Sequence, residues 1–226
     1  MKKIVVALLI FVCAGAALFA QNISMSAGVG GNFAFNFTST VFTQDYKDIV
    51  KPKEGDGNWT LMGYGGSAFF DATFVEASVG VLFGNEKGAN DSSKGTDVTA
   101  LRIGLLGKYP IDMGRGLFFF PTAGVDVMLP LGGKINGTDI NDDKVPKEYK
   151  DEFNKRYTQI WIKGGVGADI YLMPRVYIRP TFLYGVRFNT EPERDGMSEA
   201  NKGNDKMISA IVGHGLDIRF AIGYRF

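Results

Sequence analysis

A single histidine, His214, and a single cysteine, Cys13, limit the catalytic clusters that this 226-residue sequence can form. A serine or cysteine nucleophile is often activated by a histidine base, and histidine is also a common metal ligand. Any such cluster in this chain would therefore depend on His214. That residue falls within an alternating apolar segment near the C-terminus, where a polar residue needs no catalytic explanation. We predict that the protein is not an enzyme.

Two local motifs resemble ligand sites but lack the context that such sites require. The segment Asp139–Asp143, DINDD, begins like a calcium loop, which would need glycine at position 144 and glutamate at position 150. The chain has Lys144 and Lys150 there. The glycines of Gly63–Ala68, GYGGSA, loosely fit a dinucleotide fingerprint, which works only between a strand and a helix. We expect no cofactor and no metal.

The remaining candidates for chemistry are charged residues that recur at alternate positions, among glycines and small polar residues. Alternate positions of a β-strand point to the same face. Opposite charges brought together on a buried face must pair, because an unpaired buried charge is costly. We predict that one shared interior contains Asp71, Glu76, Arg102, Lys108, Asp126, Lys163, Asp169, Arg179, Arg187, Asp217, Arg219 and Arg225.

The elements that must position these charges are strands, because apolar residues occupy the alternate positions in between. The segment Gly215–Phe226, GLDIRFAIGYRF, alternates Leu, Ile, Phe, Ile, Tyr and Phe with glycine, alanine and charged residues. Pro121 and Pro180 weaken two of the predicted strands slightly, since proline removes a ladder donor. Eight strands are predicted, at about residues 22–37, 59–72, 75–83, 101–111, 117–129, 160–172, 176–188 and 208–226.

The connections between these strands alternate in length. Short ones are expected near 72–75, 112–116 and 173–175, and long ones near 38–58, 84–96, 132–157 and 189–206. Short turns at one rim and long loops at the other are typical of outer-membrane barrels, which turn apolar side chains to lipid and polar ones inward. The pattern predicts an all-β fold, a transmembrane antiparallel up-and-down β-barrel with eight strands, short periplasmic turns and four long extracellular loops. Expected aromatic belts contain Phe37, Phe83 and Phe188 outside, and Phe74, Tyr109, Tyr224 and Phe226 at the periplasmic rim.

The N-terminus predicts export. Residues 1–20 combine two lysines, an apolar run and small residues, which is typical of a secretory signal peptide. A membrane-spanning helix is the alternative, but the uncharged stretch is at the lower limit for spanning. Val12 before Cys13 argues against lipidation. We expect cleavage after Ala20 and one barrel domain over residues 21–226. The formal net charge of +1 gives no basic excess, so nucleic acid binding is not expected.

In this pattern the chain resembles the small eight-stranded outer-membrane proteins, the group of the OmpA transmembrane domain, OmpX and OmpW. The terminal Tyr224 and Phe226 resemble the C-terminal signal that this group presents to the barrel-assembly machinery. The resemblance implies location in a bacterial outer membrane, with outer-membrane lipid and the assembly machinery as partners. The lipid enzymes PagL and PagP have similar size. A PagL-like site would need a serine where Leu216 stands, and a PagP-like site would need a loop histidine beside Asp91-Ser92.

One long connection has two interpretations. Residues 145–157, VPKEYKDEFNKRY, place aromatic residues every fourth position and pair opposite charges four apart, which supports a short amphipathic helix. The other interpretation, which we favour slightly from the sequence, is a solvated and charged extension of the strand that follows.

Two classes of function remain open. An eight-stranded barrel has an interior just wide enough for side chains to fill, which favours a plugged barrel that anchors interacting loops at the cell surface. Host or surface ligands would then bind through the loops, where binding residues concentrate. The alternative is a small gated porin or an OmpW-like transporter of small solutes. Transport of apolar molecules is disfavoured because the predicted inward face is charged.

Overall fold

The computed structural model describes residues 24–42, 58–88, 95–188 and 208–226, and most of these residues belong to one antiparallel sheet. The predicted signal peptide lies outside the described residues. The long strands are β1 (Met25–Phe42), β2 (Asn58–Ala72), β3 (Val75–Gly88), β4 (Thr96–Lys108), β6 (Leu117–Ile135), β8 (Gln159–Met173), β9 (Val176–Arg187) and β10 (Ile208–Arg225). Two short strands, β5 (Ile111–Asp112) and β7 (Thr138–Asp139), and one helix, α3 (Lys147–Tyr157), complete the described elements.

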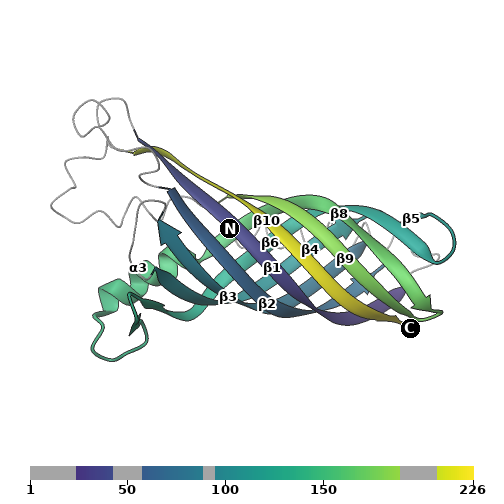
Figure 1. The fold of residues 1–226 in the computed structure, drawn as a ribbon, viewed down its shortest axis with the longest axis horizontal. Coiled ribbons are helices and arrows are strands. Elements are labelled where there is room, and N and C mark those ends of the chain that lie inside the picture. The colour runs from purple at the N-terminus through teal and green to yellow at the C-terminus, as the bar shows by residue number, and fades with distance from the viewer. Residues whose placement is uncertain (1–23, 43–57, 89–94, 189–207) are drawn as a thin grey trace, which may run out of the picture.

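The eight long strands close into a barrel (Figure 1). Each strand pairs with the next long strand in the chain, and β1 pairs with β10 in register from Ser26↔Arg225 to Thr40↔Ile211. The pairing of β4 with β6 completes the ring. No long strand is left with a free edge, so the ladder satisfies the backbone groups that an open sheet would expose. The predicted eight-stranded up-and-down barrel is confirmed.

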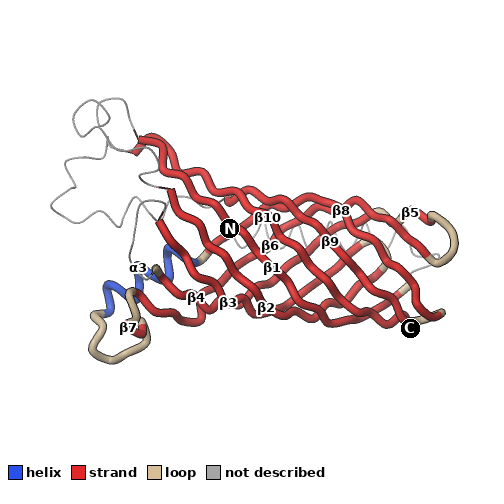
Figure 2. The backbone as a smooth tube through the Cα atoms, viewed as in Figure 1, coloured by secondary structure: helices blue, strands red, loops and turns tan. Residues whose placement is uncertain are grey.

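The wall of the barrel is apolar outside and polar inside. Val29 and Phe220 point outward and are 65% and 56% exposed, whereas the inward Asp71 and Asp217 are each 2% exposed. Outward apolar residues on β1 run from Met25 to Phe37, which is about 40 Å of strand. At a tilt of about 40° this spans roughly 30 Å along the barrel axis, which is enough to cross a membrane. Figure 2 shows the tilt of the strands. Among the described residues no helix is both long and apolar enough for that purpose.

The two rims differ as predicted. At the short-turn rim the connections are tight turns at residues 73–74, 113–116 and 174–175, and the end of β10 lies beside the start of β1. Thr73 and Arg115 have positive φ angles there, and Gly114 and Gly116 supply the same conformation without strain. At the long-loop rim lie the connections after β1, β3, β6 and β9. Of these four, only the one after β6 is described throughout.

The long connections begin later than the sequence predicted. Strand β3 continues to Gly88, and β6 continues to Ile135, beyond the expected ends at residues 83 and 129. The alternation weakens there because outward positions carry polar residues: Asn85 donates a hydrogen bond to its cross-strand partner Asp97 at 2.7 Å. The ladder therefore extends past the apolar belt. The expected loops at 38–58 and 189–206 lie largely outside the described residues.

The favoured interpretation of residues 145–157 as a strand extension is wrong. Helix α3 forms over Lys147–Tyr157, with Pro146 at its N-terminal boundary and Lys155 and Arg156 in its last turn. Only Phe153 and Tyr157 of the helix are buried. These two side chains lie on one face and pack into the barrel mouth, which gives the helix a stability that its short length would not provide alone.

Candidate functional site

A turn-side cluster of five charged residues fills the lumen next to the short-turn rim. It consists of Asp71, Glu76, Lys108, Asp169 and Arg179, from β2, β3, β4, β8 and β9. The Arg179 guanidinium donates to both oxygens of Asp169 at 2.5 and 2.7 Å, to Glu76 at 2.6 Å and to Asp71 at 2.6 Å. Lys108 forms an ion pair with the same Asp71 oxygen. One arginine thus joins three acidic residues that come from three different strands.

Aromatic rings enclose that arginine. The Arg179 guanidinium carbon lies 4.7 Å from the ring centroid of Phe69, 5.0 Å from Tyr177 and 5.3 Å from Phe120. A desolvated cation is stabilised over aromatic faces, in addition to its ion pairs.

Inward glycines provide the space for these rings. A Cβ atom at Gly28 or Gly167 would lie 2.5 Å from the rings of Phe69 and Phe120 respectively. Real Cβ atoms do not approach other atoms so closely. The high glycine content therefore has a specific role in this half of the lumen, where it lets large rings fill a narrow barrel.

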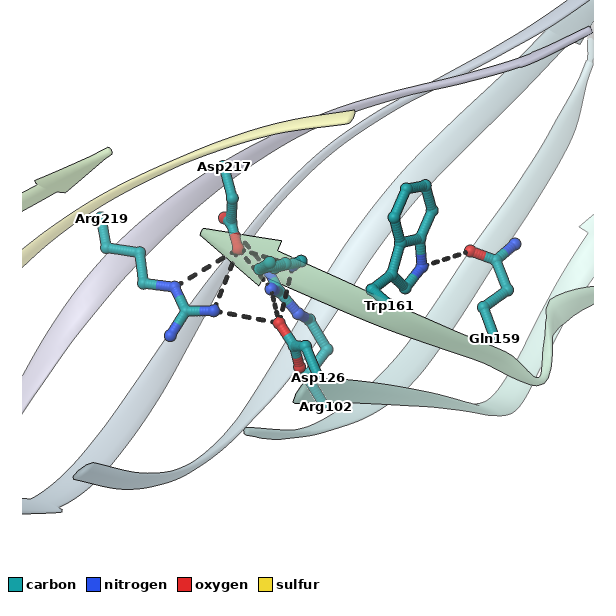
Figure 3. Close-up of polar contacts among 7 residues, drawn as sticks. Arg102, Asp126, Gln159, Trp161, Asp217 and Arg219 are labelled. Carbon is teal, nitrogen blue, oxygen red and sulfur yellow. Dashed lines mark hydrogen bonds and ion pairs between the residues drawn. The ribbon is translucent and has the colours of Figure 1, made fainter. Parts of the chain in front are cut away.

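A central cluster follows along the lumen. It consists of Arg102, Asp126, Lys163, Asp217 and Arg219. Lys163 donates to Asp126 at 2.7 Å and to Asp217 at 2.9 Å, and Arg102 forms ion pairs with the same two carboxylates. Arg219 contacts both carboxylates at 3.0 Å, and Figure 3 shows Asp126 and Asp217 facing its guanidinium group.

The two clusters balance each other electrically. The turn-side cluster has one more acidic than basic residue, and the central cluster has one more basic than acidic residue. Their ten side chains are together neutral, which keeps the cost of burying charge in a narrow lumen low.

Apolar side chains gather in the long-loop half of the lumen. A loop-side apolar cluster of buried residues contains Ala34, Leu61, Leu82, Val98, Ala100, Met128, Ile140, Phe153 and Tyr157. Beyond the central cluster, inward positions of β2, β3 and β4 carry leucine, valine and alanine, whereas Glu86 of β3 and Arg187 of β9 are buried charges in the same half.

Helix α3 closes this end. Phe153 and Tyr157 contact each other with ring centroids 4.7 Å apart and occupy the apolar cluster. Arg156 forms an ion pair with Glu86 of β3 and lies 4.6 Å from the ring centroid of Trp59. Burial, and to a lesser extent the Glu86 carboxylate, raises the pKa of the Tyr157 hydroxyl above its ordinary value.

The two outermost arginines predicted for the interior lie apart from both clusters. Arg187 is buried near the helix and donates to the Arg156 carbonyl at 3.1 Å. Arg225 lines a cavity at the opposite, short-turn rim. Near Arg225, Tyr224 packs against Phe226 with ring centroids 5.8 Å apart. Their role as an assembly signal stays a prediction.

The residues considered for enzymatic or ligand chemistry occupy structural positions. His214 faces outward between the rings of Phe37 and Tyr184, with centroids at 5.6 and 6.4 Å. The glycines of Gly63–Ala68 lie inside β2. The Asp139 carboxylate accepts a hydrogen bond from the Asn141 backbone at 2.9 Å, as in a local turn. Asp91-Ser92 lies outside the described residues, and the described residues contain no group of three or more potential metal ligands.

Sequence reasoning missed the inward aromatic residues Phe69, Phe120 and Tyr177, as well as the Glu86–Arg156 pair. The alternation of inward and outward positions would have identified the three aromatics, because each lies on the same face of its strand as a predicted inward charge. Glu86 faces the same side of its strand as Glu76 but lies beyond the predicted end of that strand.

No protein-family model and no curated protein matches the sequence. Among solved structures, Neisserial surface protein A is similar, with a TM-score of 0.48, 13% identity and coverage of 88% of this chain and 97% of that one. The outer membrane protein OprG from Pseudomonas aeruginosa has a TM-score of 0.43 and 13% identity, with coverage of 91% of this chain and 97% of that one. The outer membrane protease OmpT from Escherichia coli has a TM-score of 0.41 and 9% identity, with coverage of 92% of this chain and 99% of that one.

These similar structures are bacterial outer-membrane β-barrels, the group that the sequence pattern resembles. The barrel assignment itself rests on the closed ring of paired strands in this chain. One of the three similar proteins is a protease, so the comparisons leave enzymatic activity open.

Proposed function

We propose that this outer-membrane barrel is a membrane-anchored surface protein with a closed lumen. Its long connections and helix α3 make its contacts outside the cell. The observation that carries the proposal is that side chains occupy the lumen in three successive layers. These layers are the turn-side cluster, the central cluster and the loop-side apolar cluster beneath α3.

The layers oppose conduction for different physical reasons. Ions crossing the charged half would have to displace ion pairs such as Lys163–Asp126, which are desolvated and mutually satisfied. The loop-side apolar cluster offers few polar groups to replace an ion's hydration shell. A hollow beside the central cluster has a volume of only about 10 Å³, roughly the space of one water molecule.

Conductance of the refolded mature protein in planar bilayers tests the closed lumen. We expect no discrete current steps from protein whose folding and insertion have been shown by its resistance to denaturation in detergent. Steps of reproducible size would contradict the proposal and support the small gated pore instead. In that case neutralising the central cluster, as in Asp217→Asn, should change the step size.

The anchoring role predicts a different outcome for the loops. Replacing residues 146–157 by a short glycine-serine linker removes α3 and its exposed charged face. We expect the barrel to insert normally and any binding of the cells to surface ligands to fall. Unchanged binding by fully inserted protein would remove α3 from the proposed contact surface.

A further inference from the structure

Three arginines, the rim arginines, lie along one arc of the short-turn rim. Arg115 belongs to the turn before β6, Arg175 to the turn between β8 and β9, and Arg225 ends β10. The end of β10 and the hairpin of β5 and β6 lie at the opposite end of the barrel from α3 (Figure 1). Strands β6, β8, β9 and β10 are successive neighbours in the ring. Because neighbouring strands lie about 4.8 Å apart, the arc is roughly 20 Å long.

The rim arginines form no ion pair with an acidic side chain among the described residues. Arg115 and Arg175 are exposed, and Arg225 is half-buried at the mouth of the lumen. The one exposed acid of the same turns, Asp112, accepts a hydrogen bond at 2.7 Å from a backbone amide of its own turn. Arg175 donates to the Tyr224 hydroxyl at 3.3 Å, and the hydrogen of that hydroxyl stays available to an acceptor. The arc therefore presents donors that an anion could satisfy.

Exposed apolar side chains accompany the rim arginines. The side chains of Met113, Leu172, Met173 and Phe226 are between 61% and 68% exposed, and that of the outward Tyr224 is 43% exposed. They continue the apolar outer face of the barrel to its end, so the arc lies where hydrocarbon gives way to lipid headgroups. An arginine at such a boundary lays its stem along apolar surface and keeps its guanidinium group among the headgroups.

Charge distinguishes this arc from the rest of the rim. At residues 109–116, 173–175 and 224–226 the side chains carry three positive charges and one negative charge, and the terminal carboxylate reduces the excess without reversing it. The turn between β2 and β3 consists of Thr73 and Phe74 and contains no cation. The arc is therefore the part of the short-turn rim that complements an anionic headgroup.

We propose that the rim arginines bind an anionic phospholipid, such as phosphatidylglycerol, from the membrane leaflet that this rim contacts. A guanidinium group fits the geometry of a phosphate and donates parallel hydrogen bonds to its oxygens. Arg175 and the Tyr224 hydroxyl supply neighbouring donors, and the exposed apolar side chains contact the acyl chains. The proposal requires that the barrel spans a membrane but not that its lumen is closed, so conductance would contradict the proposed function and leave this site intact.

A lipid suits the arc better than a soluble anion does. The cations are exposed and spread along the rim, so they form no enclosed pocket around a small ion. They are also continuous with the apolar outer face that already contacts lipid. A lipid gains from both features, because basic residues at a membrane surface attract anionic headgroups while the acyl chains stay in the hydrocarbon.

Amide NMR spectra of the refolded mature barrel in zwitterionic micelles test the proposal. The titrant is phosphatidylglycerol, and phosphatidylcholine with the same acyl chains is the matched lipid. We expect saturable shifts at Met173, Arg175 and Tyr224, with phosphatidylcholine binding at least about tenfold more weakly because it has no net charge. Equal affinity for the two lipids would overturn the proposal. Equal shifts with inorganic phosphate would also overturn it, in favour of a site for soluble anions.

Variants locate the binding on the rim. Arg175→Gln should weaken phosphatidylglycerol binding about fivefold, the typical effect of one basic residue near an anionic lipid surface. Replacing all three rim arginines by glutamine should remove the preference over phosphatidylcholine. Lys87→Gln removes an exposed cation from the long-loop end of β3 and is the matched control, which should bind like the wild type.

Two outcomes would contradict this assignment. An undiminished lipid preference in the triple variant would show that the rim arginines do not bind the headgroup. An equal loss in Lys87→Gln would mean that the lipid binds at the other rim or through the overall charge. The amide spectrum of each variant checks its folding, and Arg175→Gln, at an exposed turn, decides if the triple variant does not fold.

Discussion

At the scale of single residues, Arg179 is the central stabilising residue of the turn-side cluster. It is 3% exposed, binds three carboxylates and contacts three aromatic rings. Lysine cannot replace this geometry, because an ammonium group lacks the planar fork that serves several acceptors at once.

We predict that Arg179→Met lowers the free energy of unfolding by roughly 3–5 kcal/mol, the typical cost of leaving buried partner charges uncompensated. Arg179→Lys should cost less, because it keeps the charge and loses only part of the hydrogen bonding. Urea titration of the refolded barrel, followed by tryptophan fluorescence, measures both. Arg115→Met, at an exposed turn, is the matched control and should unfold like the wild type. An equally stable Arg179→Met variant would contradict the role assigned to this cation.

The sequence predicted which face each charged residue occupies but not which residues pair. The face on which a strand residue lies can be read from the alternation of apolar and polar residues alone. The inward positions of Asp71 and Asp217 therefore follow directly from their apolar neighbours. The contact of Arg179 with Asp71, 108 residues away, depends on how strands on opposite walls are staggered. That stagger is set by the register and tilt of the whole ring, which no single segment encodes.

At the scale of elements, the sequence predicted the membrane-spanning parts of the strands and failed beyond them. Outward apolar residues give the strands their signal, and that signal ends where Asn85 and Lys87 face water while the ladder continues. The formation of helix α3 was disfavoured from the sequence for a related reason. Its charged residues suggested a solvated segment, whereas its docking depends on two aromatic side chains and on an apolar mouth formed by distant strands.

The docking of α3 should depend on pH through Tyr157. The pKa of its hydroxyl is raised in the folded protein, whereas an unfolded or released tyrosine titrates at about pH 10. The stabilising contribution is therefore complete below about pH 10 and decreases as the pH rises towards the pKa of the docked residue. We predict release of α3 in strong base, observed as a change in the fluorescence of Trp59, which contacts Arg156.

The matched comparison for this prediction uses two tyrosines of the same helix. Tyr157→Phe should remove the alkaline transition, because no ionisable hydroxyl remains at the buried position. Tyr149→Phe should retain it, since Tyr149 is 59% exposed. A transition at the same pH in all three proteins would show that another group controls the docking.

At the scale of the whole molecule, the two rims define how the barrel is oriented. The short-turn rim has tight turns with positive-φ residues and the end of β10, and the long-loop rim has α3 and the long connections. Outer-membrane barrels place short turns in the periplasm and long loops outside the cell. The proposed contact surface would then face the exterior.

Single cysteines test this orientation, since Cys13 is the only cysteine of the sequence and is replaced by serine in the background. We predict that Asn154→Cys, exposed on α3, reacts with a membrane-impermeant maleimide on intact cells. Arg115→Cys, exposed in a short turn, should react only after the outer membrane has been permeabilised. The reverse pattern would mean that the barrel has the opposite orientation, with the closed, helix-capped mouth in the periplasm. Equal labelling of both positions on intact cells would mean that the chain does not separate the two compartments, because a spanning barrel can expose only one rim to the reagent.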